Sequence, residues 1–94
     1  MRVRWLRTAL SNVEAEVDHI ARDNPEAADH VLSRIEEAVA HLAEHPAMGR
    51  AGRVPGTREL IVPGTPYVIP YRVREKTVEI LRVFHSARQW PTEF

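Results

Sequence analysis

The spacing of apolar residues divides this chain into a short strand, two helices and three further strands. Val3 and Trp5 alternate with arginines, which predicts a first strand with one buried face. Apolar residues then recur every three or four positions, as on one face of an amphipathic helix. That face comprises Leu6, Leu10, Val13, Val17 and Ile20. The solvated side is expected to hold Glu14, Glu16, Asp18 and Arg22.

A second helix is predicted to begin after a break at residues 23–26. Asn24 can accept a hydrogen bond from an amide that opens a helix, Pro25 suits the first helical position, and Glu26 favours the positive end of the helix dipole. The helix should end before Pro46, and the short connection predicts an antiparallel helical hairpin. Its apolar face comprises Ala28, Val31, Leu32, Ile35, Val39 and Leu42.

The second half of the chain predicts strands separated by turns. Glycine and proline mark residues 47–56 as a loop, and strands are expected at 58–62, 67–74 and 77–84. The order β-α-α-β-β-β predicts an α+β fold, in which the helical hairpin packs on one face of a small antiparallel sheet. Residues 1–94 are too few for a second core, so a single domain is expected.

A two-residue turn at Glu75-Lys76 would fix which side chains share a face of that sheet. In this register Arg74 faces Thr77, Arg72 faces Glu79 and Val68 faces Val83. The core face would hold Tyr67, Ile69, Tyr71, Val73, Val78, Ile80, Arg82 and Phe84. The opposite face would hold Val68, Arg72, Arg74, Glu79, Leu81, Val83 and His85. Because this second face mixes apolar and charged residues, we expect it to form a partner groove.

Composition narrows the setting of the protein. There is no cysteine, no apolar run long enough to span a membrane and no signal peptide, so a cytoplasmic protein is expected. Net charge is zero, but it is unevenly placed. Residues 1–45 hold five basic and nine acidic side chains (−4), whereas residues 46–94 hold eight basic and four acidic ones (+4). The C-terminal half should therefore attract an acidic partner.

The end of the last predicted strand carries the most distinctive chemistry. His85, Arg88 and Trp90 fall within six residues. Histidine can transfer protons near neutral pH, and arginine can hold a phosphate or a carboxylate. The group could be a nucleic-acid site, a partner-binding patch or a structural cap. When this group is combined with the groove residues, the predicted partner-binding residues are Val68, Arg72, Leu81, Val83, His85, Arg88 and Trp90.

Two further groups of residues have side chains that can bind ligands. Arg50, Arg53 and Arg58 surround a glycine-containing loop and could bind an anion, although any tight loop also needs glycine. His41 and His45 stand four residues apart without a third ligand, so no metal site is predicted, and no motif indicates a cofactor.

Five segments resemble the RelE/ParE family of toxins from type II toxin–antitoxin modules. They are Asn24–Ala28, Leu42–Arg50, Gly56–Leu60, Pro66–Arg72 and Val78–Arg88. The resemblance covers nearly the whole chain and keeps the order of the family's motifs. The resemblance implies a cytosolic toxin that is neutralised by a small antitoxin, whose acidic and apolar tail wraps the sheet and helices.

The resemblance implies one of two activities. RelE-like members cleave mRNA on the ribosome, whereas ParE-like members poison DNA gyrase. RelE-like nucleases commonly carry basic residues where this chain has Glu59 and Ile61, and an arginine where it has Val68. Their C-terminal catalytic tyrosine is also missing, with Trp90 nearby instead. These departures favour the gyrase branch.

The nuclease remains the alternative hypothesis. In it, His85 would be the general acid or base, and Arg88 and Arg82 would stabilise charge on the phosphate. A third hypothesis is a module that has lost its toxicity and keeps only the antitoxin-binding surface.

Overall fold

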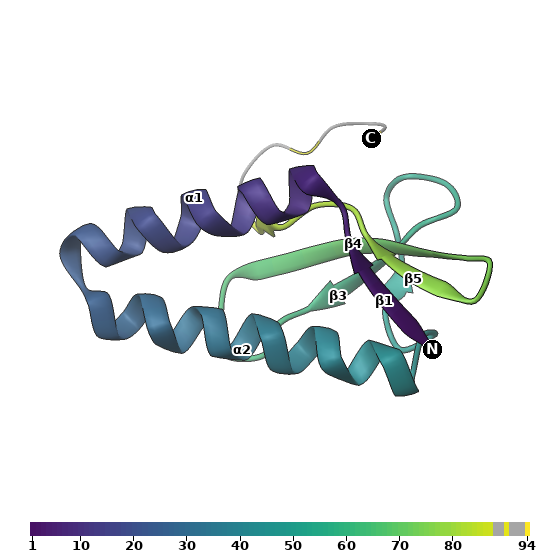
Figure 1. Ribbon diagram of the computed structural model, residues 1–94. Coiled ribbons are helices and arrows are strands. Elements are labelled where there is room, and N and C mark those ends of the chain that lie inside the picture. The colour runs from purple at the N-terminus through teal and green to yellow at the C-terminus, as the bar shows by residue number, and fades with distance from the viewer. Residues whose placement is uncertain (88–89, 91–93) are drawn as a thin grey trace.

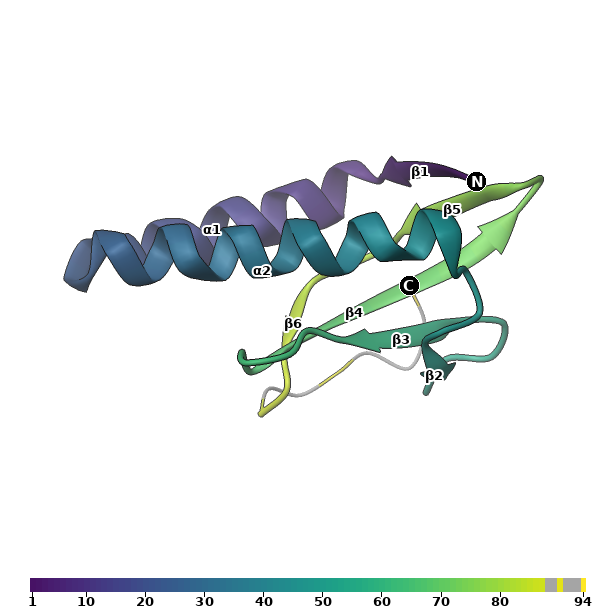
Figure 2. The ribbon, with the colours of Figure 1, turned by 90° about the horizontal axis from the view of Figure 1, so that it is seen from below.

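Two helices cover one face of a six-stranded sheet in the computed structural model, which describes residues 1–87, 90 and 94 (Figures 1 and 2). The helices are α1 (Arg7–Asp23) and α2 (Pro25–Glu44), and the strands are β1 (Arg2–Trp5), β2 (Arg50–Ala51), β3 (Arg58–Ile61), β4 (Tyr67–Arg74), β5 (Thr77–Ile80) and β6 (Phe84–His85). The predicted α+β fold and helical hairpin are confirmed, and the short strands β2 and β6 add to the predicted order.

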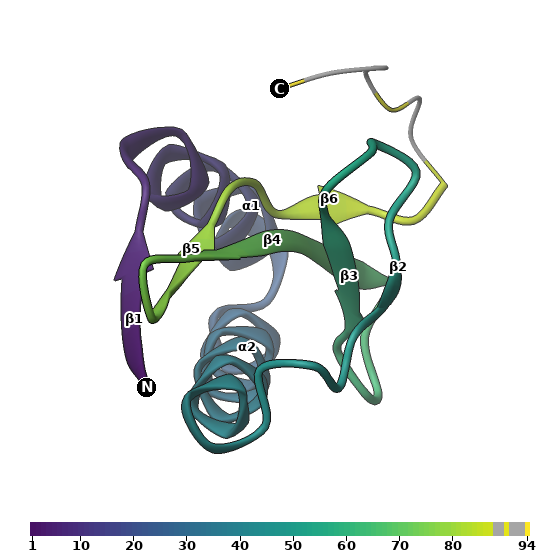
Figure 3. The same cartoon turned by 90° about the vertical axis from the view of Figure 1, so that its right-hand side faces the viewer.

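The sheet is mixed and not wholly antiparallel as predicted, because its first strand runs parallel to its neighbour. The strand order is β1-β5-β4-β3-β2, with β6 also paired to β4. β1 lies along β5 with Arg4 opposite Glu79, and the amide of Leu6 extends this pairing by donating to the carbonyl of Ile80 at 3.0 Å. β1 and β2 therefore form the two edges of the sheet (Figure 3).

The turn between the helices forms as its sequence predicts. The side chain of Asn24 accepts a hydrogen bond from the amide of Ala27 at 3.1 Å, and Pro25 is the first residue of α2. Asn24 itself has extended backbone angles, with φ −152°. It thus ends α1 and caps α2, and this sharp reversal lays the two helices side by side.

The core lies between the helical hairpin and the sheet. It is formed by Ala9, Val13, Ile35, Ala38, Val39, Leu42, Leu60, Val62, Tyr67, Ile69, Tyr71, Val78, Ile80 and Val83. The predicted apolar face of α2 is confirmed at Ile35, Val39 and Leu42. In α1, Leu10 is 47% exposed, so its predicted place in the buried stripe is wrong.

Tyr71 is the largest side chain that the core buries completely. Its hydroxyl donates to the carbonyl of Pro46 at 2.8 Å and accepts from the amide of Gly49 at 2.9 Å. Burial raises the pKa of Tyr71 above its ordinary value, against smaller opposing effects of the Gly49 amide and the charge of Arg58. A methyl group on Gly49 would lie 2.6 Å from the tyrosine oxygen, so this close approach requires glycine.

The predicted strand register is confirmed near the hairpin. Arg74 faces Thr77 and Arg72 faces Glu79, as predicted. The turn residues Glu75 and Lys76 have φ of 50° and 62°, the left-handed geometry of a tight two-residue hairpin.

Beyond Ile80 the predicted register is wrong. Residues 81–83 leave the strand, and the ladder resumes with Val68 opposite Phe84 instead of Val83. This one-residue bulge turns Val83 into the core, where it is 2% exposed. Phe84 and Arg82, which were expected on the core face, are half-buried and are not part of the core.

Candidate partner-binding surface

The face of the sheet turned away from the helices is the candidate site, here called the open face. Side chains alternate along each strand, so residues that neighbour core positions project from this face. They include Arg2, Arg4, Glu59, Ile61, Val68, Pro70, Arg72, Arg74, Glu79 and Phe84. Val68 is 4% exposed and Leu81 is 2% exposed, so these two predicted contact residues form its buried floor.

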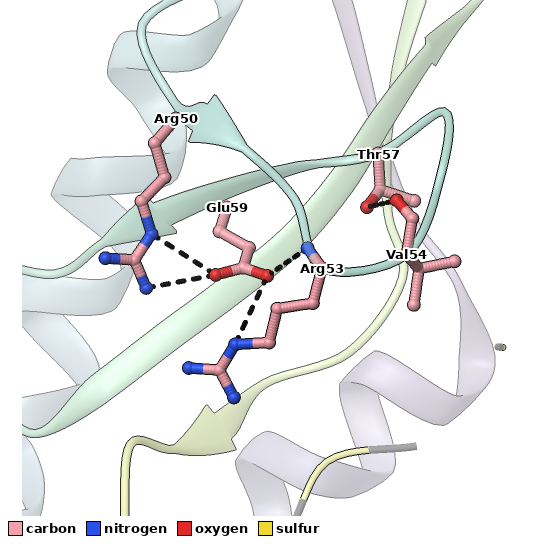
Figure 4. A network of polar contacts seen from close by, with 5 residues as sticks. All are labelled: Arg50, Arg53, Val54, Thr57 and Glu59. Carbon is pink, nitrogen blue, oxygen red and sulfur yellow. Dashed lines mark hydrogen bonds and ion pairs between the residues drawn. The ribbon is translucent and has the colours of Figure 1, made fainter. Parts of the chain in front are cut away.

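A buried carboxylate organises one end of the open face (Figure 4). Glu59 is 2% exposed, and one of its oxygens accepts from Nε and Nη2 of Arg50 at 3.3 and 3.0 Å. Its other oxygen accepts from the amide of Arg53 at 2.8 Å and lies 3.7 Å from the Nε of that residue. Because a buried charge needs a partner, Glu59 fixes both guanidinium groups on the surface. These three residues are the Glu59 cluster.

A second carboxylate organises arginines from two neighbouring strands. Oε1 of Glu79 accepts from Nε of Arg72 at 2.6 Å, and the guanidinium groups of Arg4 and Arg74 each lie 4.0 Å from the carboxylate. The hydrogen bond from Arg72, helped by the charges of all three arginines and opposed by burial, holds the pKa of Glu79 below its ordinary value. These four residues are the Glu79 cluster.

Three aromatic rings, those of Phe84, Trp90 and Phe94, lie close together at the open face. The ring of Phe84 lies 4.7 Å from that of Trp90 and 6.2 Å from that of Phe94. The guanidinium of Arg53 stacks 3.9 Å above Trp90, and that of Arg82 lies 5.3 Å from Phe94. In such contacts the positively charged guanidinium is attracted to the negative face of the aromatic ring. Trp90 is thus a half-buried packing residue of this surface.

The structure turns His85 away from the open face. It pairs across the ladder with Tyr67, a core residue, and the two rings meet edge to face at 5.7 Å. Nδ1 of His85 accepts from the amide of Ala87 at 3.1 Å. The predicted position of His85 on the groove face is therefore wrong, because the bulge reverses the alternation that the prediction assumed.

Tyr67, the ring that His85 contacts, also contacts a buried acid that the sequence predicts to be in solvent. Glu16 is 6% exposed, and its carboxylate accepts a hydrogen bond from the hydroxyl of Tyr67 at 3.1 Å. The prediction that Glu16 lies on the solvated side of α1 is wrong. Nothing in the local pattern of α1 indicated this contact, because its partner is 51 residues away.

Of the three residues of the nuclease hypothesis, the structure describes Arg82 and His85, and these two make separate contacts. Arg82 donates from Nη1 to the carbonyl of Leu81 at 2.6 Å, and His85 lies on the helix side. Arg88 lies outside the described residues. The three arginines predicted to bind an anion together do not share one set of contacts. Arg50 and Arg53 share Glu59, whereas Arg58 donates to the carbonyls of Ala47 and Gly49 at 3.3 and 2.8 Å.

Among residues 1–87, 90 and 94, no three acidic, histidine or cysteine side chains lie close enough together to hold a metal ion. His41 is exposed in the last turn of α2, and His45 is the C-terminal cap of that helix. Neither described helix combines the length and apolarity needed to cross a membrane.

The chain is similar to known proteins over almost its full length. The family model for the ParE toxin of type II toxin–antitoxin systems, parDE, matches residues 3–90. The chain belongs to this toxin family. The Y4kP protein of Sinorhizobium fredii is 48% identical, over 96% of this chain and 93% of its own length. Toxin RelE2 of Caulobacter vibrioides is 37% identical, over 92% of this chain and 96% of its own.

A solved structure agrees with the family match. The chromosomal ParDE toxin–antitoxin system from P. aeruginosa contains a chain that is 33% identical to this ParE-family toxin, with a TM-score of 0.82. The similarity covers 90% of this chain and 95% of that one. The protein is therefore a toxin of a type II toxin–antitoxin system, and the resemblance seen in its sequence segments is confirmed.

Proposed function

We propose that this chain stops growth by inhibiting DNA gyrase and is held inactive by a cognate antitoxin. The proposal of gyrase inhibition instead of RNA cleavage rests on the position of His85. A nuclease needs a general acid or base beside cations that stabilise the phosphate in the transition state. His85 instead contacts Tyr67 on the helix side, away from the arginines of the open face.

Two arginines that a nuclease could use are also engaged within the chain. Arg72 donates a hydrogen bond to Glu79, and Arg82 donates one to the carbonyl of Leu81. The match to the ParE family model and the likeness to a ParDE toxin support the same branch. The solved neighbour belongs to a toxin–antitoxin system, which supports an antitoxin as the partner of this chain.

A supercoiling assay tests this function. Purified toxin, free of antitoxin, should inhibit gyrase-catalysed supercoiling of relaxed plasmid, and addition of the antitoxin encoded beside it should restore activity. His85→Ala should retain inhibition, because His85 has no catalytic part in this mechanism. Wild-type toxin that leaves supercoiling unchanged at micromolar excess would refute gyrase as the target.

A ribosome-dependent RNase is the second candidate, and the 37% identity to toxin RelE2 favours it. In that case toxin added to translating ribosomes should produce cleavage in the A-site codon, detected by primer extension, and His85→Ala should abolish it while remaining folded. If the toxin neither inhibits gyrase nor causes cleavage on the ribosome, and its overexpression leaves growth unaffected, the chain keeps only the antitoxin-binding function.

A further inference from the structure

One edge of the sheet is free to hydrogen-bond with a partner. β1 is the end strand, and none of the described elements lies beyond it (Figure 3). The amide of Leu6 points toward β5, where it donates to the carbonyl of Ile80 at 3.0 Å. Because successive residues of a strand direct their backbone groups to opposite sides, those of Val3 and Trp5 point away from β5. The edge therefore offers two amides and two carbonyls to an added strand.

A hollow of about 240 Å³ lies between this edge and α2. Its lining residues are Val3, Trp5, Glu36, Val39 and Ala40. Small-molecule sites usually measure about 300–1,000 Å³, so this hollow suits a single side chain of a protein partner. Half-buried Trp5 supplies an aromatic ring and exposed Glu36 supplies a carboxylate. A ring beside a carboxylate favours a cationic side chain, that of lysine or arginine.

The two sides of β1 favour opposite charges in a partner. Arg2 and Arg4 are exposed on the open face, where the side chain of Arg4 is 68% exposed. On the other side, α1 and α2 hold nine acidic and three basic residues, and eight of the acids are exposed. An added strand would therefore favour acidic side chains toward the arginines and basic ones toward the helices. Because side chains alternate along a strand, acidic and basic residues should alternate in its sequence.

These charges disfavour two other occupants of the edge. A second copy of β1, paired antiparallel with Val3 opposite Val3, would place Arg2 opposite Arg4. The register with Val3 opposite Trp5 would place Arg4 opposite Arg4, and like charges directly opposite each other destabilise a sheet. A wholly acidic segment, such as the tail that the sequence resemblance implies for the antitoxin, would be repelled by the exposed acids of the helices.

We propose that the toxin binds gyrase through the free edge of β1. An extended segment of gyrase adds to the sheet as a further strand, with acidic side chains toward Arg2 and Arg4. A lysine or arginine of the same segment lies over the ring of Trp5 and meets Glu36. Backbone hydrogen bonds supply much of the affinity, and the hollow supplies specificity. This inference deepens the proposed function and rests on it.

Two variants block the edge in different ways. Val3→Pro removes an amide that points away from β5, and proline is tolerated on an edge strand where its nitrogen faces solvent. Glu36→Lys reverses the charge at the hollow and changes an exposed residue. Glu37→Lys is the matched control, because Glu37 is also exposed and follows directly in α2 but lines a different hollow, beside Pro63. Thermal unfolding followed by circular dichroism checks that each variant is folded.

Inhibition of gyrase supercoiling by free toxin is the first measurement. We expect Val3→Pro and Glu36→Lys each to raise the toxin concentration for half-inhibition at least tenfold, whereas Glu37→Lys changes it less than twofold. Calorimetric affinity for the antitoxin encoded beside this chain should change less than threefold in all three. Wild-type potency in both edge variants would overturn the inference. So would a tenfold loss of antitoxin affinity with gyrase inhibition retained, since the edge would then belong to the antitoxin.

A peptide titration separates this surface from the choice of target. A ten-residue peptide of alternating glutamate and lysine is added to isotope-labelled toxin, and the backbone amides of Val3 and Trp5 are followed by NMR. It should shift them more than a peptide in which five glutamates precede five lysines, and Glu36→Lys should weaken its binding at least threefold. Equal shifts from the two peptides would refute the alternating pattern.

The two measurements fail in distinguishable ways. A toxin that binds the alternating peptide at β1 but leaves gyrase active refutes gyrase as the target and keeps the binding edge. A toxin that inhibits gyrase, with both edge variants as potent as the wild type, refutes the edge and keeps the target.

Discussion

Replacement of Tyr71 by phenylalanine should destabilise the toxin without altering its surface. The side chain is completely buried, and its hydroxyl connects the loop after α2 to the sheet through Pro46 and Gly49. Phenylalanine preserves the ring and its packing. The variant therefore isolates the contribution of one hydroxyl group.

The magnitude follows from the two groups that lose their partner. The amide of Gly49 is buried and the carbonyl of Pro46 is half-buried. An unsatisfied buried group costs about 1–3 kcal/mol, and the less buried carbonyl costs the smaller share. We expect Tyr71→Phe to lower the free energy of unfolding by about 2–3 kcal/mol. In a domain of this size, that corresponds to a Tm lower by roughly 10–20 °C.

The pH dependence of unfolding supplies an independent check. Burial raises the pKa of Tyr71, so the folded protein keeps the phenolic proton at pH values where the unfolded chain has lost it. Its contribution is complete below about pH 10 and declines as pH rises through the folded-state pKa. The difference in stability between wild type and Tyr71→Phe should therefore shrink above pH 10.

Urea denaturation monitored by circular dichroism, at pH 7.5 and at several values above 10, measures both effects. A loss below 0.5 kcal/mol at pH 7.5 would refute the reasoning, because the two orphaned groups would then be satisfied in another way. A difference that stays constant above pH 10 would refute the assignment of the raised pKa.

Three further predictions concern stability. Replacing Glu75-Lys76 by Asn-Gly should raise the free energy of unfolding by about 1 kcal/mol in urea denaturation, because both positions have positive φ. Asn24→Ala should lower it by about 1 kcal/mol, whereas Asn24→Asp, which keeps the cap, should change it by only a few tenths. Hydrogen bonding from Arg72 lowers the pKa of Glu79, so its contribution is present above pH 4.5 and is lost as pH falls below that value. An acid titration of Glu79→Gln should show a shallower loss of stability below pH 4.5 than the wild type, and an equal loss would contradict this.

Local signals in the sequence were sufficient for the helices and the hairpin. Asn24 and Pro25 carry capping chemistry that acts within a single turn, and the two-residue turn fixes the pairing of Arg72 with Glu79. The two-helix, one-sheet architecture follows once these elements are placed.

The bulge could not be predicted because the strand that contains it has no alternation. Residues 80–84 are nearly all apolar, so either register buries hydrophobic side chains and neither face is specified. That error moved Val83 and His85 to the wrong face. The burial of Glu16 and the convergence of arginines on Glu59 depend on contacts between distant segments, which no local pattern encodes.

The parallel pairing of β1 with β5 affects how the protein folds during translation. β1 is synthesised first, but its partner strand begins only at Thr77. At 5–20 residues per second, about 4–15 s of synthesis separate the two strands. Until then β1 has no neighbour in the sheet, and only the helical hairpin and the pairing of β2, β3 and β4 can form. The sheet of this toxin therefore cannot be completed until most of the chain has been synthesised, and its first strand stays without a partner through almost the whole of translation.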